Sequence, residues 1–415
     1  MSQLYTLSNG IRLVVDPMPS LETAAFGVWA HAGSVDERSE EHGVAHLLEH
    51  MAFKGTGRRT ARQIAEEIES VGGYLNAATS HQRTGYYART LKSDLPLAVD
   101  IIADILLNPA FEEGELIKER EVVVQEIGEA ADTPDDVVFE LLMAASWGAH
   151  PLARSILGTP ETVRAQTPVS LRGFMDRCYG PGDMVIAAAG NVDGDELAGL
   201  LESSFIAKGA SIERARHSVV QFSGDVRHDS RDIEQTHLAL AFPGVSSRDD
   251  DYFATRIYAD VLGGGMSSRL FQKVREERGL AYSVYAFADG FEQCGLTGAY
   301  VGADAEQIGE TAQLIRAEME LMTISVVQAE IDRARALLRS SLMMGLESPA
   351  VRIETAAGQL FTFDKLMTPE EITSRLDAVS ITDIKRCAAR TLSGAYSIAM
   401  VGPGDAAAVE RVIIG

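Results

Sequence analysis

The residues best suited to chemistry in this chain are two histidines and a glutamate in the segment His46-Leu47-Leu48-Glu49-His50. The segment has no Gly or Pro and consists mostly of good helix formers, so it is predicted to be helical. At about 100° per residue, His46 and His50 lie one turn apart on one face of that helix. Two imidazoles in this arrangement can hold a tetrahedral Zn²⁺, and the Glu49 carboxylate can then accept a proton from a water molecule beside the ion.

The order of these residues, His-x-x-Glu-His, reverses the commoner His-Glu-x-x-His zinc motif. Pairs of histidines at this spacing also occur by chance in helices that bind nothing. Here the neighbouring side chains are apolar, namely Leu47, Leu48, Met51 and Phe53. Polar groups embedded in an apolar helix need partners, which favours a metal site. His42, one turn before His46, is a rival ligand, although a solvent-facing position is the favoured interpretation for it.

A third ligand is expected from the acidic segment 112–130, which is predicted to be a long helix. Most glutamates on such a helix face solvent. The apolar face of this helix is formed by Leu116, Val123 and Ile127. Glu119 and Glu126 are seven residues apart, so they lie within about 20° of each other at one edge of that face. Glu121 and Glu129 fall on the polar side. The helical geometry therefore leaves Glu119 and Glu126 as the inward-facing candidates.

Composition limits the classes of function. The chain has 415 residues, 46% of them hydrophobic and 23% charged, as expected for a globular protein of two to three domains. Its net charge of −23 argues against nucleic acid or an anionic membrane as a partner. Cys178, Cys294 and Cys387 are odd in number and far apart, which favours buried thiols over disulfides or a cysteine zinc site.

No targeting segment is recognisable at the N-terminus. Residues 1–6 carry no basic segment followed by an apolar run, and no Arg-rich amphipathic sequence follows them. No apolar stretch reaches the length needed to cross a bilayer. We therefore expect a cytoplasmic protein with no membrane segment.

The predicted elements repeat along the chain. In the first half, strands are expected at 11–15, 23–32, 74–79, 84–89 and 184–189, and further helices at 61–71 and 95–107. Periodicity is lost between about 203 and 232. Beyond this, strands are expected at 237–242, 281–288 and 295–301, and helices at 251–262, 305–323 and 326–345. Segments 184–193 and 396–405 match at an offset of about 212 residues, with Ile, Ala, Gly and Asp coinciding.

These observations predict an α+β fold of two homologous domains, each a mainly antiparallel sheet with helices packed on one face. We expect a catalytic zinc-binding domain at 1–210, a linker at 211–232 and a homologous second domain at 233–415. The His-x-x-Glu-His motif occurs only in the first half, so the metal belongs there.

The motif and its surroundings resemble the pitrilysin (insulinase-type) family of zinc peptidases, family M16. The resemblance rests on residues 41–56, on Lys118-Glu119-Arg120, and on Glu126 at 76 residues beyond His50, and it extends over essentially the whole chain. In size the chain resembles the small two-domain branch that includes the mitochondrial processing peptidases and their bacterial relatives. The resemblance implies that His46, His50 and Glu126 bind one Zn²⁺ per chain. It further implies that Glu49 is the catalytic base and that Glu119 supports the site.

Two further segments gain a role from the same resemblance. The strand at 73–80 could be an ordinary sheet strand or an edge that pairs with an extended peptide. Its resemblance to the family's Asn-Ala-x-Thr strand implies that Asn76, Ala77 and Ala78 bind substrate. Arg275 and Tyr282 resemble a pair that reaches the zinc site from the second domain, with Tyr282 stabilising the oxyanion and Arg275 positioning substrate or the tyrosine.

The glycine-rich segment 263–265 could suggest phosphate binding, but it lacks the lysine of a P-loop. A flexible loop or a helix boundary is favoured there. The expected function is thus a zinc endopeptidase that hydrolyses peptides or unfolded segments bound in extended form between two domains. The resemblance also implies a homodimer with composite active sites. Two alternatives are a non-catalytic scaffold, which typically lacks motif residues, and one subunit of a heterodimer whose partner supplies the Arg/Tyr half.

Overall fold

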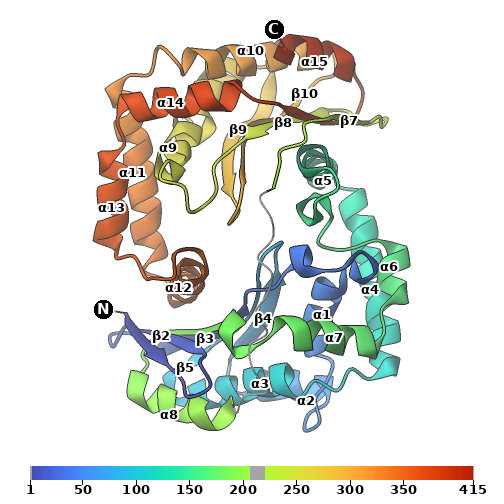
Figure 1. The fold of residues 1–415 in the computed structure, drawn as a ribbon, viewed down its shortest axis with the longest axis vertical. Coiled ribbons are helices and arrows are strands. Elements are labelled where there is room, and N and C mark those ends of the chain that lie inside the picture. Colours follow the sequence, from blue (N-terminus) through green and yellow to red (C-terminus); the bar gives the residue numbers. More distant parts are fainter. Residues whose placement is uncertain (1, 206–219, 415) are drawn as a thin grey trace. The chain divides into compact units, whose positions relative to one another are not determined.

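The computed structural model describes residues 2–205 and 220–414, and its two sheets define two units (Figure 1). The first unit contains the described residues of 1–128, 155–215 and 344–366. The second contains those of 129–154, 216–343 and 367–415. None of the described helices is long and apolar enough to cross a membrane.

Six strands form the sheet of the first unit: β1 (Gln3–Thr6), β2 (Arg12–Pro17), β3 (Thr23–Ala30), β4 (Tyr74–Thr79), β5 (Thr84–Leu91) and β6 (Met184–Gly190). Their order is β1-β2-β6-β3-β5-β4, and every neighbouring pair is antiparallel except β2 with β6. Strand β4 is therefore an edge strand. It turns one row of main-chain groups away from the sheet, where no described strand pairs with it.

Alternation along the central strand β3 explains how both faces of this sheet are buried. Helices α2 (Ala61–Ser70), α3 (Leu95–Leu107) and α8 (Gly194–Ser204) cover one face of this sheet (Figure 1). Phe26 and Val28 belong to the apolar cluster on that face. Ala25 and Trp29 point to the other face, where they pack against α12 (Pro349–Phe363). Helix α12 comes from the second half of the sequence, so one helix covers the face opposite the main helical layer.

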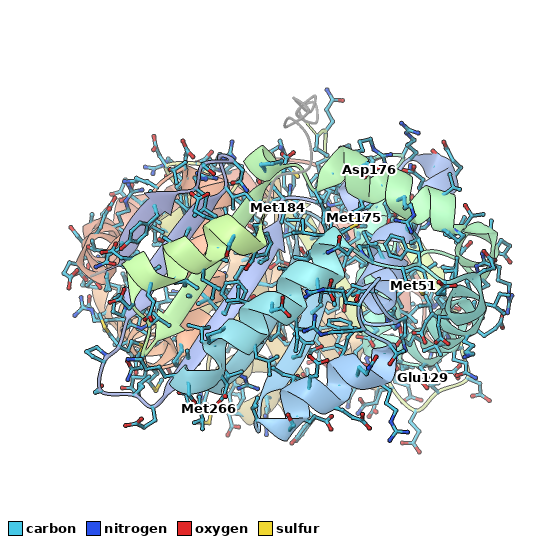
Figure 2. All side chains as sticks on the ribbon, turned by 90° about the horizontal axis from the view of Figure 1, so that it is seen from below. Met51, Glu129, Met175, Asp176, Met184 and Met266 are labelled. Carbon is cyan, nitrogen blue, oxygen red and sulfur yellow. The ribbon has the colours of Figure 1, made fainter. Side chains whose placement is uncertain are left out.

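A separate helical group packs beside this sheet and carries the histidine motif. It contains α1 (Val44–Ala52), α4 (Glu113–Ala131), α6 (Pro160–Ala165) and α7 (Pro168–Cys178). Met51 on the buried side of α1 belongs to the same apolar cluster as Met175 on α7, and Figure 2 shows the two side chains on neighbouring helices. This apolar cluster fixes the face of α1 that turns inward.

Five strands form the sheet of the second unit: β7 (Val226–Asp229), β8 (Thr236–Pro243), β9 (Ala281–Gly290), β10 (Gly295–Ala303) and β11 (Ser397–Val401). Their order is β7-β11-β8-β10-β9, with only β7 and β11 parallel. The main helical layer of the second unit packs against this sheet. It consists of α9 (Tyr252–Gly263), α10 (Ile308–Leu321), α11 (Gln328–Gly345), α13 (Pro369–Ala378), α14 (Ile381–Leu392) and α15 (Ala406–Ile414).

The opposite face of the second sheet is covered by α5 (Pro134–Trp147), a helix from the first half of the sequence. Its Phe139 ring lies 5.7 Å from the ring of Tyr300 and 5.6 Å from that of Phe287. Each sheet thus receives one helix from the other half of the sequence. The remaining short helices are η1 (Ser34–Asp36), η2 (Ser39–Glu41), η3 (Lys92–Asp94), η4 (Pro151–Ala153), η5 (Pro181–Asp183) and the π-helix η6 (Phe271–Glu276).

The predicted fold class, with two mainly antiparallel sheets and packed helices, is confirmed, and so is the internal repeat. The expected helices on one face are joined by one helix on the opposite face of each sheet, α12 and α5. Strands β6 and β11, which carry the matching segments, each lie between a parallel neighbour and an antiparallel one in their own sheet. Residues 226–229 of the segment expected to be a linker form strand β7. Buried and exposed side chains do not alternate along β7, so its sequence shows no strand pattern. The rest of that expectation includes residues 206–219, which lie outside the described residues. The boundaries at 210 and 233 stay a prediction. Cys178, Cys294 and Cys387 are buried, and no disulfide joins any two of them, as expected.

Candidate metal centre

Helix α1 is held at its N-terminus by a buried carboxylate. Gly43, the residue before the helix, has φ of 87°, a left-handed conformation that favours glycine. Its N–H and that of Ala45 donate to the two oxygens of Glu37 at 3.0 and 2.9 Å. Glu37 is only 4% exposed, and a negative charge at this end of a helix is stabilised by the helix dipole. The helix that carries the motif is therefore fixed in position from its first turn.

Three side chains from α1 and α4 converge at one point. Nε2 of His46 lies 3.7 Å from Oε2 of Glu126, and Nε2 of His50 lies 3.5 Å from the same oxygen. One potential ligand atom from each of the three residues lies within 4.8 Å of the other two. Of the two inward-facing glutamates expected on α4, Glu126 is the one that meets both imidazoles.

The donor set and its spacing fit a zinc ion. Two atoms that each lie about 2.0–2.1 Å from a tetrahedral ion are about 3.3 Å apart, close to the two nitrogen–oxygen distances in this group. Two imidazoles and one carboxylate leave a fourth position open, which is typical of catalytic zinc rather than structural zinc. The residues His46, His50 and Glu126 therefore form a donor set suited to Zn²⁺.

Burial keeps the first of these ligands neutral. The side chain of His46 is 13% exposed, and desolvation together with the neighbouring His50 lowers its pKa to about 4. A neutral imidazole can offer a lone pair to a metal at neutral pH. Its Nδ1 is buried and has no hydrogen-bond partner among the described residues. The Nδ1 side of His46 is thus held by packing rather than by a hydrogen bond within the described residues.

The second histidine is supported by an ion pair. Nδ1 of His50 lies 3.1 Å from Oε2 of Glu119, and the other oxygen of that carboxylate lies 2.6 Å from the ammonium of Lys54. A carboxylate accepts, so this contact places the ring proton on Nδ1 and leaves the Nε2 lone pair facing Glu126. The sequence-predicted supporting role of Glu119 matches this arrangement.

Glu49 lies beside the cluster without belonging to it. Its Oε2 accepts a hydrogen bond of 2.6 Å from Oγ1 of Thr79 on β4. Burial raises the pKa of the Glu49 carboxyl, and the Thr79 hydrogen bond and the nearby His50 oppose that rise. Glu49 is thus a partly desolvated carboxylate held in place by Thr79, an environment suited to a proton acceptor.

The residues expected to bind substrate lie on the edge strand that carries Thr79. Along β4, Asn76 and Ala78 are exposed and Ala77 is buried, so the strand alternates as an edge strand should. The side chain of Asn76 folds over its own backbone, where its Oδ1 accepts from the N–H of Ala77 at 2.9 Å. Its Nδ2 donates to the Tyr74 hydroxyl at 2.7 Å. Strand β4 therefore links Glu49, through Thr79, to the edge of the sheet.

Arg275 and Tyr282 belong to the second unit and contact each other there. The guanidinium carbon of Arg275 lies 4.7 Å from the ring centre of Tyr282 and 4.7 Å from that of Phe271. Arg275 is therefore held between two aromatic rings as a cation–π sandwich. It lies in η6, and π-helical turns of this kind are frequent at functional sites. Tyr282 is 78% exposed, so its hydroxyl is accessible.

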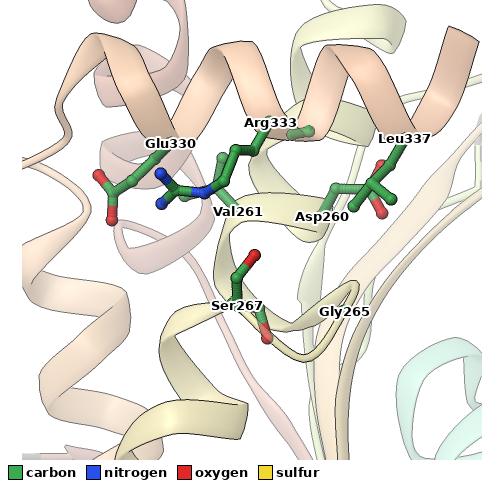
Figure 3. A pocket seen from close by; sticks show the side chains of 9 residues that line it. Asp260, Val261, Gly265, Ser267, Glu330, Arg333 and Leu337 are labelled. Carbon is green, nitrogen blue, oxygen red and sulfur yellow. The ribbon is translucent and has the colours of Figure 1, made fainter.

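Two rival interpretations from the sequence can now be assessed. His42 is half-buried, and its Nε2 lies 2.8 Å from the main-chain oxygen of Ser155, so the expected solvent-facing position is wrong. It does not join the metal-ligand group. The glycine-rich segment is the C-terminal boundary of α9, because Gly263 ends the helix and Gly264 caps it. The hollow beside it in Figure 3 holds about 10 Å³, room for about one water molecule and not for a phosphate.

Sequence reasoning assigned no role to four residues that contact the expected site residues or the helix that carries them, namely Glu37, Lys54, Thr79 and Phe271. Thr79 lies inside the strand 73–80, three residues after Asn76, and Lys54 lies inside the segment 41–56. Glu37 and Phe271 are residues of ordinary types outside these segments, and nothing in their spacing marks them. Their roles follow from which elements pack together.

Comparison with known proteins gives a consistent result. Residues 12–160 match the family described as Insulinase (Peptidase family M16), and residues 167–338 match the family described as Peptidase M16 inactive domain. A protein of Streptomyces coelicolor named as an uncharacterized zinc protease is 37% identical, covering 96% of this chain and 89% of its own length. The uncharacterized zinc protease YmxG of Bacillus subtilis is 35% identical, covering 97% of this chain and 98% of its own.

Two solved structures share the fold. A Pseudomonas fluorescens structure described as a peptidase M16 inactive domain has a TM-score of 0.89 at 22% identity, covering 97% of this chain and 98% of its own. A protease from Helicobacter pylori has a TM-score of 0.90 at 21% identity, covering 97% and 99%. At these identities the likeness concerns the fold alone.

Proposed function

Since this chain belongs to the insulinase family of peptidases, family M16, and to its small two-domain members, we propose that it is a zinc-dependent endopeptidase. Its substrates are peptides or unfolded segments bound in extended form. The relatives named as zinc proteases support the zinc-dependent peptidase. The observation that carries the proposal is the convergence of His46, His50 and Glu126, with Glu49 beside them and outside the ligand group.

Zn²⁺, held by His46, His50 and Glu126 with one ion per chain, would supply Lewis-acid polarisation of the scissile carbonyl and would lower the pKa of a water molecule. Glu49 then accepts the proton of that water and delivers it to the leaving amine. Its partial burial suits this role, because a raised pKa makes a carboxylate a stronger base near neutral pH. Thr79 keeps the receiving carboxylate in one orientation.

The substrate is proposed to pair with the free edge of β4. Main-chain hydrogen bonds along an edge strand bind an extended peptide with little dependence on its sequence. The contact between Thr79 and Glu49 places this edge beside the proposed base. Asn76, Ala77 and Ala78 would supply the binding segment, and the small side chains of the two alanines would leave room for the side chains of the substrate.

Arg275 and Tyr282 complete the proposal. Tyr282 is proposed to donate a hydrogen bond to the oxyanion of the tetrahedral intermediate, and Arg275 to position the substrate or that tyrosine. We propose a homodimer in which the metal residues of one chain act together with the partner's Arg275 and the partner's Tyr282. The motivation is the resemblance to family members with this assembly.

Metal removal tests the proposed activity. Peptides blocked at both ends are incubated with the protein, and cleavage products are identified by mass spectrometry. Internal cuts that stop on chelation and resume with added Zn²⁺ are expected. Glu126→Gln should lose bound metal, because a neutral amide is a poorer ligand. Full activity and full zinc content in Glu126→Gln would overturn the ligand assignment.

Mixing two inactive variants tests the assembly. Glu49→Gln and Tyr282→Phe subunits are allowed to exchange, and exchange is verified with mass-labelled chains. If sites combine residues of two chains, each mixed dimer has one intact site. Random pairing then makes about a quarter of all sites functional. If activity stays at the level of the separate variants despite complete exchange, the composite site is wrong.

A further inference from the structure

Glu119 is a buried anion with two partners of different kinds. It is 6% exposed, one of its oxygens lies 3.1 Å from Nδ1 of His50, and the other lies 2.6 Å from the ammonium of Lys54. A buried carboxylate with a single neutral partner is costly, because the lost hydration of its charge is not compensated. Lys54 is the cation that compensates it.

The placement of Lys54 follows from the end of α1. Helix α1 ends at Ala52, and the N–H of Lys54 still donates to the main-chain oxygen of Met51 at 3.2 Å. Lys54 is four residues beyond His50, so both side chains leave the same end of the helix and reach one carboxylate from α4. A cation here is also favoured by the C-terminal end of the helix dipole.

We propose that Lys54 is a positioning residue of the zinc site, acting through Glu119 on His50. Lys54 compensates the charge of the Glu119 carboxylate and holds it in place, so that the second carboxylate oxygen faces Nδ1 of His50. The Nε2 lone pair of His50 then stays directed at the metal position. This inference rests on the proposed zinc site. It extends the support of the metal to a residue that touches neither the ion nor the substrate.

The two histidines of the proposed zinc site differ in what holds their Nδ1 atoms. Nδ1 of His46 has no hydrogen-bond partner among the described residues, whereas Nδ1 of His50 is bound by the Lys54–Glu119 pair. Groups that orient a metal-binding imidazole typically change metal affinity by about 10- to 100-fold when they are removed. The Lys54–Glu119 pair should therefore account for a large share of zinc retention.

The test is a zinc-affinity measurement on the full-length, metal-free protein by competition with a chelator. Lys54→Met removes the ammonium and keeps most of the side-chain length, and Lys54→Arg keeps the charge. The matched control is Lys118→Met, which removes a lysine from an exposed pair with Glu115 on α4. Lys54→Met is expected to weaken zinc binding about 10-fold or more. Lys54→Arg should bind more tightly than Lys54→Met, and Lys118→Met should match the wild type.

A double-variant cycle separates this role from a general loss of stability. If Lys54 acts through Glu119, adding Lys54→Met to Glu119→Gln should weaken zinc binding no further, because the neutral amide needs no compensating cation. Additive losses would show that Lys54 acts elsewhere and would overturn the proposal, as would wild-type zinc affinity in Lys54→Met. If Lys54→Met does not fold, Lys54→Gln provides the same comparison. Failure of the wild type to bind zinc would instead contradict the proposed function itself.

Discussion

In the first unit, the α-helix that follows the central strand β3 is α1. In the second unit, the α-helix that follows the equivalent strand β8 is α9. The strand orders β2-β6-β3-β5-β4 and β7-β11-β8-β10-β9 correspond one to one, including the single parallel pair in each. Helix α1 carries two histidines and a glutamate beside a glutamate-bearing helix. Helix α9 instead buries Ile257, Tyr258 and Leu262 in its own core.

This difference shows that the sheet plan does not determine the chemistry. Both units contain an equivalent helix, and within residues 2–205 and 220–414 the one group of side chains that could hold a metal lies in the first unit, at the edge of the apolar contact of α1. The edge strands differ as well. Strand β4 contacts the proposed base through Thr79, while β9 carries the exposed Tyr282 at its start. The same architecture thus carries a candidate metal centre in one unit and an arginine–tyrosine pair in the other.

The largest effect should come from removing the base. Glu49→Gln keeps the three ligands, so it should keep about one zinc per chain while turnover falls by about 10³-fold or more. The matched control is Asp260→Asn on α9, which removes a carboxylate of similar burial from the equivalent helix and should leave turnover and zinc content unchanged. Zinc content and initial rates are measured together. Loss of zinc in Glu49→Gln would make this residue a ligand and contradict its role.

The pH dependence of stability should distinguish the two units in the metal-free protein. The pKa of His46 is about 4 when folded and 6.5 when unfolded, so between these values the unfolded state binds more protons. Stability therefore rises with pH across this window, by about 3 kcal/mol at 1.4 kcal/mol per pKa unit. His46→Gln should remove that part of the slope. His237 on β8, whose pKa burial also lowers, is less buried, so His237→Gln should remove less.

Chemical unfolding of chelator-treated protein from pH 4 to pH 7 measures these slopes. Other carboxylates and histidines titrate in the same range, so the comparison is between each variant and the wild type at every pH. Equal slopes for wild type and His46→Gln would show that His46 is not held in a desolvated position.

A smaller effect is expected for the hydrogen bond between β4 and α1. Thr79→Val keeps the shape of the side chain and removes the hydroxyl that donates to Glu49, whereas Thr79→Ser keeps the hydroxyl. Loss of orientation of a general base should lower kcat by about 10- to 100-fold in Thr79→Val, with zinc content unchanged. Thr79→Ser should recover most of the rate. Equal rates in both variants would mean that the hydroxyl has no role in positioning Glu49.

Much of this organisation could be predicted from sequence because it is local. Helical and strand periodicity placed elements such as 95–107 and 74–79 where the structure has them. The repeat between 184–193 and 396–405 predicted two similar sheets, and the structure places β6 and β11 equivalently in them. The spacing within His46-x-x-Glu49-His50 predicted one ligand face because a single helix fixes it.

What could not be predicted depends on packing between distant segments. An apolar stripe shows which side of α5 or α12 is buried, but not that each covers the sheet formed mainly by the other half of the chain. The helical wheel placed Glu119 and Glu126 within about 20° of each other. Which of them meets the ring nitrogens facing the metal depends on how α4 lies against α1. Lys54 lies in the segment 41–56, but that pattern assigns it no role, and its contact with Glu119 depends on the same packing of α4 against α1.

The smallest expected effect concerns the second unit, where Phe271 and Tyr282 hold Arg275 between their rings. Phe271→Leu keeps an apolar side chain and removes one aromatic face, while the contact with Tyr282 remains. A cation–π contact at a partly exposed site is worth about 0.5–1 kcal/mol, so the rate should fall about 2- to 5-fold. Phe271→Trp should retain the rate, because the larger ring still offers a face to the guanidinium.

The matched control is Phe253→Leu, which removes a longer cation–π contact of 5.8 Å with Arg375 in the same unit. If Phe271→Leu and Phe253→Leu leave kcat/KM equally unaffected, the sandwich around Arg275 does not position it for the reaction.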